Sequence, residues 1–99
     1  MIKNYKKYVS NPNVGDYVYC EEKGISGKLY DFIYSNIGQI ISKNDIINTY
    51  KIKYENIPHG LDYGYFEDHC RTINWFEIKY FSKNKEELEL RLQSKKYNI

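Results

Sequence analysis

The side chains that could carry chemistry gather in one segment, residues 55–70. This segment holds acids, two histidines and a cysteine, and no lysine or arginine occurs between residues 54 and 70. Carboxylates, imidazoles and thiols are the groups that bind metals or act as acids and bases. The members of this set are His59, Asp62, Glu67, Asp68, His69 and Cys70.

The spacing of these groups does not match a known reactive site. Zinc ligands usually come in short pairs, whereas the two histidines are ten residues apart and no CxxC pair is present. A thiol nucleophile needs a neighbouring base, but His69 and Cys70 are adjacent and would point to opposite faces of a strand. A ribonuclease-like active site of two histidines and a lysine remains an alternative, although the spacing of these residues does not indicate one. We therefore expect no catalytic residue, no metal and no cofactor, and a small hydrolase or nuclease is the least favoured function.

Aromatic side chains accompany the acids in the same segment, and tyrosine and tryptophan are common anchors of protein interfaces. We therefore expect a surface that binds a protein partner with basic charge. Trp75 is assigned instead to the core beneath this segment, and a core position is the alternative for Phe66. The predicted partner-binding residues are Asp62, Tyr63, Tyr65, Phe66, Glu67 and Asp68.

Nucleic-acid binding is the second hypothesis, because lysines interleave with tyrosines near the start of the chain. Stacking rings beside ammonium groups bind single strands. The candidate residues are Lys3, Tyr5, Lys6, Lys7, Tyr8, Lys51 and Lys53. Against this, the chain contains only two arginines, and its net charge of +2 divides into basic ends and an acidic middle.

The composition favours strands and a cytoplasmic chain. Isoleucine, lysine, asparagine and tyrosine make up 48 of the 99 residues, and alanine is absent. No signal peptide is recognised, and no apolar stretch approaches the roughly 20 residues of a membrane span. The two cysteines, Cys20 and Cys70, are expected to be buried thiols rather than a disulfide.

Apolar periodicity predicts the elements that must position these residues. Strands are expected over 14–20, 38–43 and 50–54, the last two as a hairpin. A short helix is expected over 29–36, from apolar residues at helical spacing. Residues 55–70 are expected to form a long loop, because they contain a proline and two glycines.

The last third of the chain is predicted to hold two strands and a helix. A strand pair is expected near 70–75 and 76–81. Residues 88–92 alternate as in a strand, but Asn84 with Glu87 three residues later forms a capping box. The capping box favours a helix over about 85–95.

Four short segments carry a family resemblance: Val14-Gly15-Asp16-Tyr17-Val18, Ile37-Gly38-Gln39-Ile40-Ile41, Tyr50-Lys51-Ile52-Lys53-Tyr54 and Glu77-Ile78-Lys79-Tyr80. Their order resembles small Src-homology-3-like β-barrels, the architecture of KOW and Tudor domains. The length of the chain predicts a single domain over 1–99, and the resemblance, like the composition, implies a mostly β fold. The barrel would span 14–81, with a short inserted helix and a C-terminal helix within 82–97.

The composition and layout also resemble small phage or mobile-element proteins of AT-rich hosts. That resemblance implies a non-catalytic protein-binding module that inhibits a host or defence protein in the host cytoplasm. An RNA- or DNA-binding barrel of the same type is the alternative. Fold-level likeness by itself does not carry function.

Overall fold

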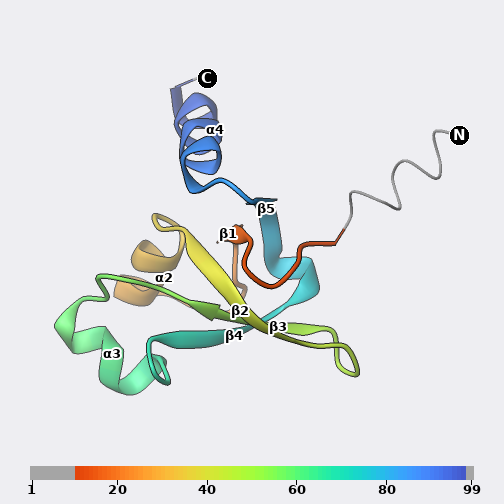
Figure 1. Ribbon diagram of the computed structural model, residues 1–99. Helices are drawn as coiled ribbons and strands as arrows, with labels where there is room; N and C mark the ends of the chain where they lie inside the picture. Colours follow the sequence, from red (N-terminus) through yellow and green to blue (C-terminus); the bar gives the residue numbers. More distant parts are fainter. Residues whose placement is uncertain (1–10, 98–99) are drawn as a thin grey trace, which may run out of the picture.

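The computed structural model describes residues 11–97, and the side chains of residues 95–97 are not described. This part of the chain contains five strands, three α-helices and one 3-10 turn (Figure 1). The elements in order are β1 (Tyr17–Cys20), α2 (Gly27–Ile33), β2 (Gly38–Asn44), β3 (Thr49–Lys53), α3 (His59–Tyr65), β4 (Cys70–Asn74), the 3-10 turn η1 (Trp75–Glu77), β5 (Ile78–Ser82) and α4 (Lys85–Tyr97).

The strands form one open antiparallel sheet in the order β4-β3-β2-β1-β5. The last strand therefore returns beside the first, with Tyr17 opposite Ser82. Register shifts occur between Tyr19 and Cys20 and between Ile40 and Ser42, and such bulges bend a sheet. As a result β1 and β5 run across the direction of β3 and β4 (Figure 1).

The strand alternation that the sequence predicts for residues 50–54 is confirmed. Tyr50, Ile52 and Tyr54 are buried, whereas Lys53 is exposed. Burying one large apolar side chain stabilises the fold by about 1.5–3 kcal/mol. Because β3 buries two such side chains, Tyr50 and Ile52, it contributes strongly to the core. The core cluster consists of Val18, Cys20, Leu29, Phe32, Ile33, Ile40, Tyr50, Ile52, Tyr54, Leu61, Phe66 and Ile73.

Two helices follow the sequence prediction. The helix expected over 29–36 is α2, which begins two residues earlier and buries Leu29, Phe32 and Ile33. The helix expected over 85–95 is α4, and the Glu87 amide donates to the Asn84 side-chain oxygen at 3.1 Å. The predicted N-cap is therefore in place.

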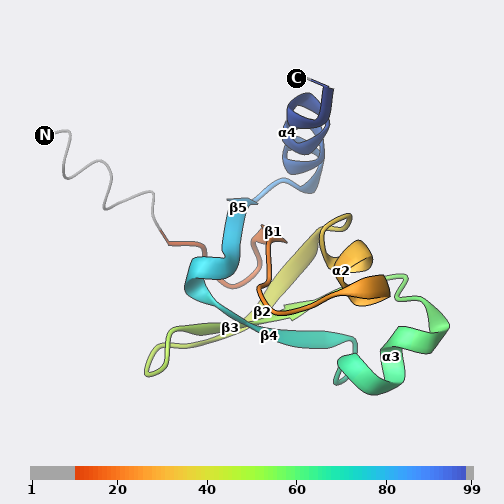
Figure 2. The ribbon, with the colours of Figure 1, turned by 180° about the vertical axis from the view of Figure 1, so that it is seen from behind.

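Residues 55–70 were predicted to form a long loop, and this is wrong, because they contain α3. Helix α3 lies beside α2 at one end of the sheet, opposite the β2–β3 turn (Figure 2). Only Leu61 is buried along α3, so the segment lacks the apolar stripe that would predict a helix. Gly60 and Gly64 are also poor helix formers, which favours a loop prediction.

The predicted pairing of strands 70–75 and 76–81 is also wrong. Both strands exist, but β4 pairs with β3 and β5 pairs with β1. The 3-10 turn η1 redirects the chain from one edge of the sheet to the other. Trp75 lies on this turn and is 59% exposed, so its assignment to the core is wrong as well.

The β-rich expectation agrees with the fold at a coarse level. The sheet organises the core, although helices contain about as many residues as strands. Among residues 11–97, β4 and β5 are the sheet edges and do not pair with each other, so closure into a barrel is not established. In the described part of the chain, no helix has the length and apolar character needed to cross a membrane.

Candidate functional site

The structure places most of the predicted partner-binding residues together on α3 and the turn that follows it. Tyr63 is 85% exposed and Tyr65 53% exposed, and both lie on α3 with the half-buried Asp62. Glu67 and Asp68 are exposed in the turn before β4. We name these five residues, Asp62, Tyr63, Tyr65, Glu67 and Asp68, the acidic–aromatic surface.

Phe66 does not belong to this surface, because only 9% of it is exposed. Its ring packs edge-on against Phe32 at 5.9 Å and Tyr54 at 6.0 Å between centroids. Each such aromatic pair adds about 0.5–1.5 kcal/mol beyond area burial. Phe66 therefore packs the end of α3 against the core. The alternative prediction for Phe66, a position in the core, is the one that the structure shows.

A tight turn presents the two acids after Phe66. Glu67 and Cys70 exchange two backbone hydrogen bonds of 2.9 Å, and Asp68 and His69 both have positive φ angles. Positive φ at both central residues is typical of a type I′ hairpin turn. Nδ1 of His69 lies 3.3 Å from Oδ2 of Asp62, which links the turn to α3.

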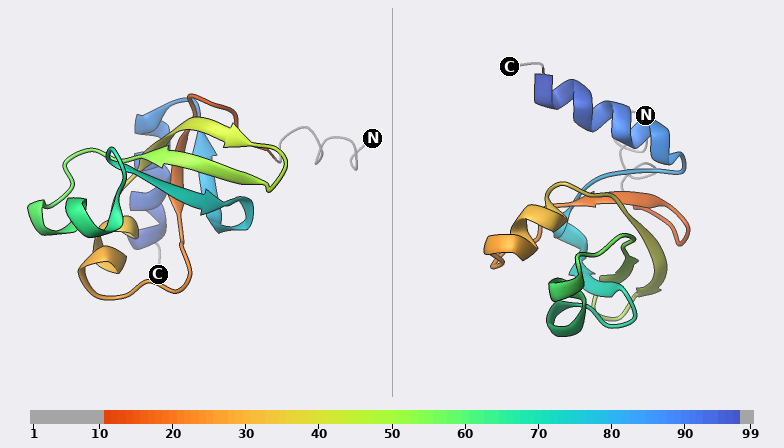
Figure 3. Two further views of the ribbon diagram at one scale, coloured as in Figure 1. Left: turned by 90° about the horizontal axis from the view of Figure 1, so that it is seen from below. Right: turned by 90° about the vertical axis from the view of Figure 1, so that its left-hand side faces the viewer.

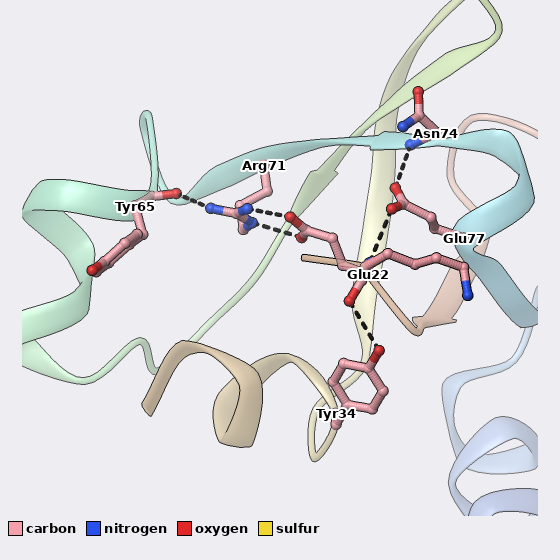
Figure 4. A network of polar contacts seen from close by, with 7 residues as sticks. Glu22, Tyr34, Tyr65, Arg71, Asn74 and Glu77 are labelled. Atoms are coloured by element: carbon pink, nitrogen blue, oxygen red, sulfur yellow. Dashed lines mark hydrogen bonds and ion pairs between the residues drawn. The ribbon is translucent and has the colours of Figure 1, made fainter. Parts of the chain in front are cut away.

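A buried ion pair contacts the C-terminal end of α3 (Figure 4). Arg71 on β4 donates to both carboxylate oxygens of Glu22, with 2.8 Å between Nε and Oε1, and to the carbonyl oxygen of Tyr65. The two charged side chains are only 16% and 10% exposed. The hydrogen bond to Glu22 raises the pKa of Arg71, so the guanidinium remains charged.

The same network extends to Tyr34, which follows α2, and to Glu77 on η1 (Figure 4). The Tyr34 hydroxyl donates to the carbonyl of Glu22 at 2.9 Å. The buried Glu77 carboxylate accepts backbone amides of Lys23 and Asn74, each at 3.0 Å. A buried carboxylate is tolerated because such donors satisfy it. Sequence reasoning missed these residues, and the only signal was that Arg71 is one of two arginines in the chain.

The two thiols are buried, as expected, and are not in a disulfide. Burial raises the pKa of Cys20 to about 12, and burial also raises the pKa of Cys70. Activated nucleophiles need the opposite shift. Among the described residues, no group of three or more His, Cys, Asp and Glu side chains could hold a metal ion.

The lysines and tyrosines of the nucleic-acid hypothesis are only partly described. Lys3, Tyr5, Lys6, Lys7 and Tyr8 lie outside the described residues. Lys51 and Lys53 lie on one face of β3, and Lys53 pairs in register with Cys70. This short basic face therefore borders the turn that carries Glu67 and Asp68.

Comparison of the chain with protein-family models, with curated proteins and with solved structures found no match. The chemistry of its own surfaces is therefore what bears on function.

Proposed function

We propose that the protein is a non-catalytic protein-binding module, whose acidic–aromatic surface contacts a partner with basic charge. One observation carries this proposal: exposed tyrosines and carboxylates share a single rigid support. Tyr63 and Tyr65 offer ring area on α3, and Glu67 and Asp68 stand beside them in the turn. Tyrosine anchors within a polar surround are typical of energetically important interface residues.

The support is rigid because it is held from two directions. Phe66 packs into the core, and Arg71 binds the carbonyl of Tyr65 while it pairs with Glu22. A surface that is already ordered loses less conformational entropy when a partner binds. The partner's lysines and arginines would meet Glu67 and Asp68, and these charges would mainly set specificity and association rate.

The test is capture of a partner by three tagged forms of the full chain. The surface variant is Asp62→Asn with Glu67→Gln and Asp68→Asn. The control variant, Asp31→Asn with Asp45→Asn and Glu86→Gln, removes three exposed acids elsewhere. We expect the surface variant to lose at least about tenfold in partner recovery, measured by mass spectrometry, and the control variant to lose nothing. Equal recovery by all three forms would refute the surface assignment.

RNA or DNA binding is the second candidate, favoured by Lys51 and Lys53 on one face of β3. It predicts binding that weakens steeply with salt, because lysines release counterions from phosphates. Treating the captured sample with nuclease separates the two candidates. Loss of the captured material after nuclease, together with its loss in Lys51→Gln/Lys53→Gln, would favour nucleic acid.

We also keep the Src-homology-3-like architecture as a proposal. It is supported by the strand order, in which β5 returns beside β1 after a meander of four strands. Close approach of the β4 and β5 edges in solution, measured as nuclear Overhauser effects between them, would support a barrel. The finer proposal, a phage or mobile-element inhibitor of a host or defence protein in the host cytoplasm, rests on the composition and on the protein-binding proposal above.

A further inference from the structure

A second surface, which is concave, lies between α4 and the outer face of the bent sheet. Its volume is about 870 Å³. Figure 3 shows α4 extended above β1, with α2 to one side of this space. Its aromatic lining consists of Tyr17 and Tyr19 on β1, Tyr80 on β5, and Tyr34 after α2. We name this space the tyrosine groove.

Helix α4 forms one wall of the groove, and Leu88 and Arg91 are among the residues that hold it there. Leu88 is fully buried, and the Arg91 guanidinium lies 4.2 Å from the centroid of the Tyr80 ring. Tyr80 in turn stacks beside Tyr19, with 6.2 Å between centroids. Cation–π contacts of this kind contribute about 0.5–1 kcal/mol at exposed sites. The groove therefore depends on α4, which lies outside residues 14–81, the span that resembles a Src-homology-3-like barrel.

Two of the rings that line the groove, those of Tyr19 and Tyr34, are held by their neighbours. The Tyr19 hydroxyl donates to the carbonyl of Tyr34 at 3.1 Å, and Tyr34 stacks on Tyr30 with 4.0 Å between centroids. Gln39 donates its amide to the carbonyl of Gly15 at 3.1 Å. Burial also raises the pKa of Tyr19 to about 12, so its hydroxyl stays neutral. Fixed rings lose little entropy when a ligand covers them.

The charges around the groove balance. The lining contains Lys53, Lys79 and Lys85 together with Glu21, Glu55 and Glu89. A polyanion would meet three carboxylates and a polycation would meet three ammonium groups, so neither is favoured. A polypeptide can carry both signs on one strand, and its backbone groups can bond to amide and hydroxyl side chains.

We propose that the tyrosine groove binds an extended peptide segment that carries both acidic and basic residues. The proposal deepens the protein-binding function and rests on it, since the same partner could supply both this segment and the basic surface that meets α3. The two surfaces are built on different elements, so each can be disabled separately.

The probe is a displayed library of short random peptides, selected on the full immobilised chain. We expect enriched peptides to carry both charge signs. Tyr17→Thr combined with Glu89→Lys should weaken the best peptide at least about tenfold, whereas Tyr63→Ala should leave its Kd unchanged. Thr keeps the strand propensity at position 17, and Lys keeps the helix propensity at position 89.

Three results would overturn the proposal. Selection could yield no peptide that prefers the wild-type chain over the double variant. The best peptides could lose affinity in Tyr63→Ala instead, which would assign them to the acidic–aromatic surface. The groove could also bind a neutral oligosaccharide such as maltohexaose, or a single-stranded oligonucleotide, more tightly than any selected peptide. The partner-capture experiment on the acidic variants is scored independently, so failure here leaves that function standing.

Discussion

At the scale of single residues, the two arginines of the chain have different structural roles. The buried Arg71 side chain forms an ion pair with Glu22 and donates a hydrogen bond to the carbonyl of Tyr65 at the end of α3. Arg91 is exposed on α4 and covers the ring of Tyr80. Removing one partner of a buried ion pair leaves an uncompensated charge, which costs about 3–5 kcal/mol. Removing an exposed cation from an aromatic face costs about 0.5–1 kcal/mol.

Arg71→Met is therefore expected to lower the free energy of unfolding by about 3 kcal/mol, because it strands the Glu22 carboxylate. Arg91→Met is the matched control and should cost less than about 1 kcal/mol. Urea titrations of both variants, followed by circular dichroism, measure the difference. Equal losses for the two variants would show that Glu22 finds another partner or takes up a proton.

At the scale of elements, the sheet depends on a close approach at the start of β2. Gly38 lies opposite Val18 of β1, and a methyl group there would overlap the γ-methyl of Ile52. The same methyl would lie 3.1 Å from the carbonyl oxygen of Lys53 and 3.1 Å from the Tyr54 ring. Gly60 on α3 has no neighbour within 4 Å of such a methyl. One glycine is thus required by packing, and the other only weakens its helix.

Gly38→Ala is expected to destabilise the fold by about 1–3 kcal/mol, because the core must shift to admit the methyl. Gly60→Ala should instead stabilise it by about 0.5–1 kcal/mol, because alanine favours the helix that α3 already forms. Thermal unfolding of the two variants should move the melting temperature in opposite directions. A neutral Gly38→Ala would mean that β2 and β3 can move apart to admit the methyl group without loss of stability.

At the scale of the whole molecule, α4 packs on β1 and β5 outside the main core cluster. Leu88 is buried but is not part of the main core cluster, whereas β3 lies between two strands and contributes Tyr50 and Ile52 to that cluster. Elements with few buried contacts open locally at lower free energy than the core. The tyrosine groove, which α4 closes on one side, would open with it.

Native-state hydrogen exchange should therefore be slowest in β3 and much faster in α4. Leu88→Ala removes the main anchor of α4, a change that typically costs about 2–5 kcal/mol. We expect it to speed exchange throughout α4 and to leave β3 almost unchanged. If β3 and α4 exchanged at one common rate in the wild-type chain, α4 would belong to the same cooperative unit as the sheet.

Several features could be predicted from local sequence alone. The alternation at residues 50–54 placed Tyr50 and Ile52 in the core, and the spacing of Leu29, Phe32 and Ile33 predicted α2. The N-cap at Asn84 outweighed the strand-like alternation of the tail, because a cap satisfies backbone amides that alternation does not. The reciprocal half of the capping box is not formed, since the Asn84 amide donates to Ser82 Oγ and the Glu87 carboxylate accepts from the same hydroxyl. Of the six predicted partner-binding residues, five lie in exposed or half-buried positions, whereas Phe66 takes the core position that was its alternative.

The sequence by itself thus determined most of the short segments that form strands and helices and where the acids and tyrosines gather, since these depend on neighbours within a few residues. Only the tertiary structure decided that β4 and β5 lie at opposite edges, that α3 is a helix, and that Trp75 is exposed. It also brought Arg71 to Glu22, 49 positions away in the chain. Strand partners, buried ion pairs and grooves depend on residues far apart in sequence, and local periodicity holds no information about them.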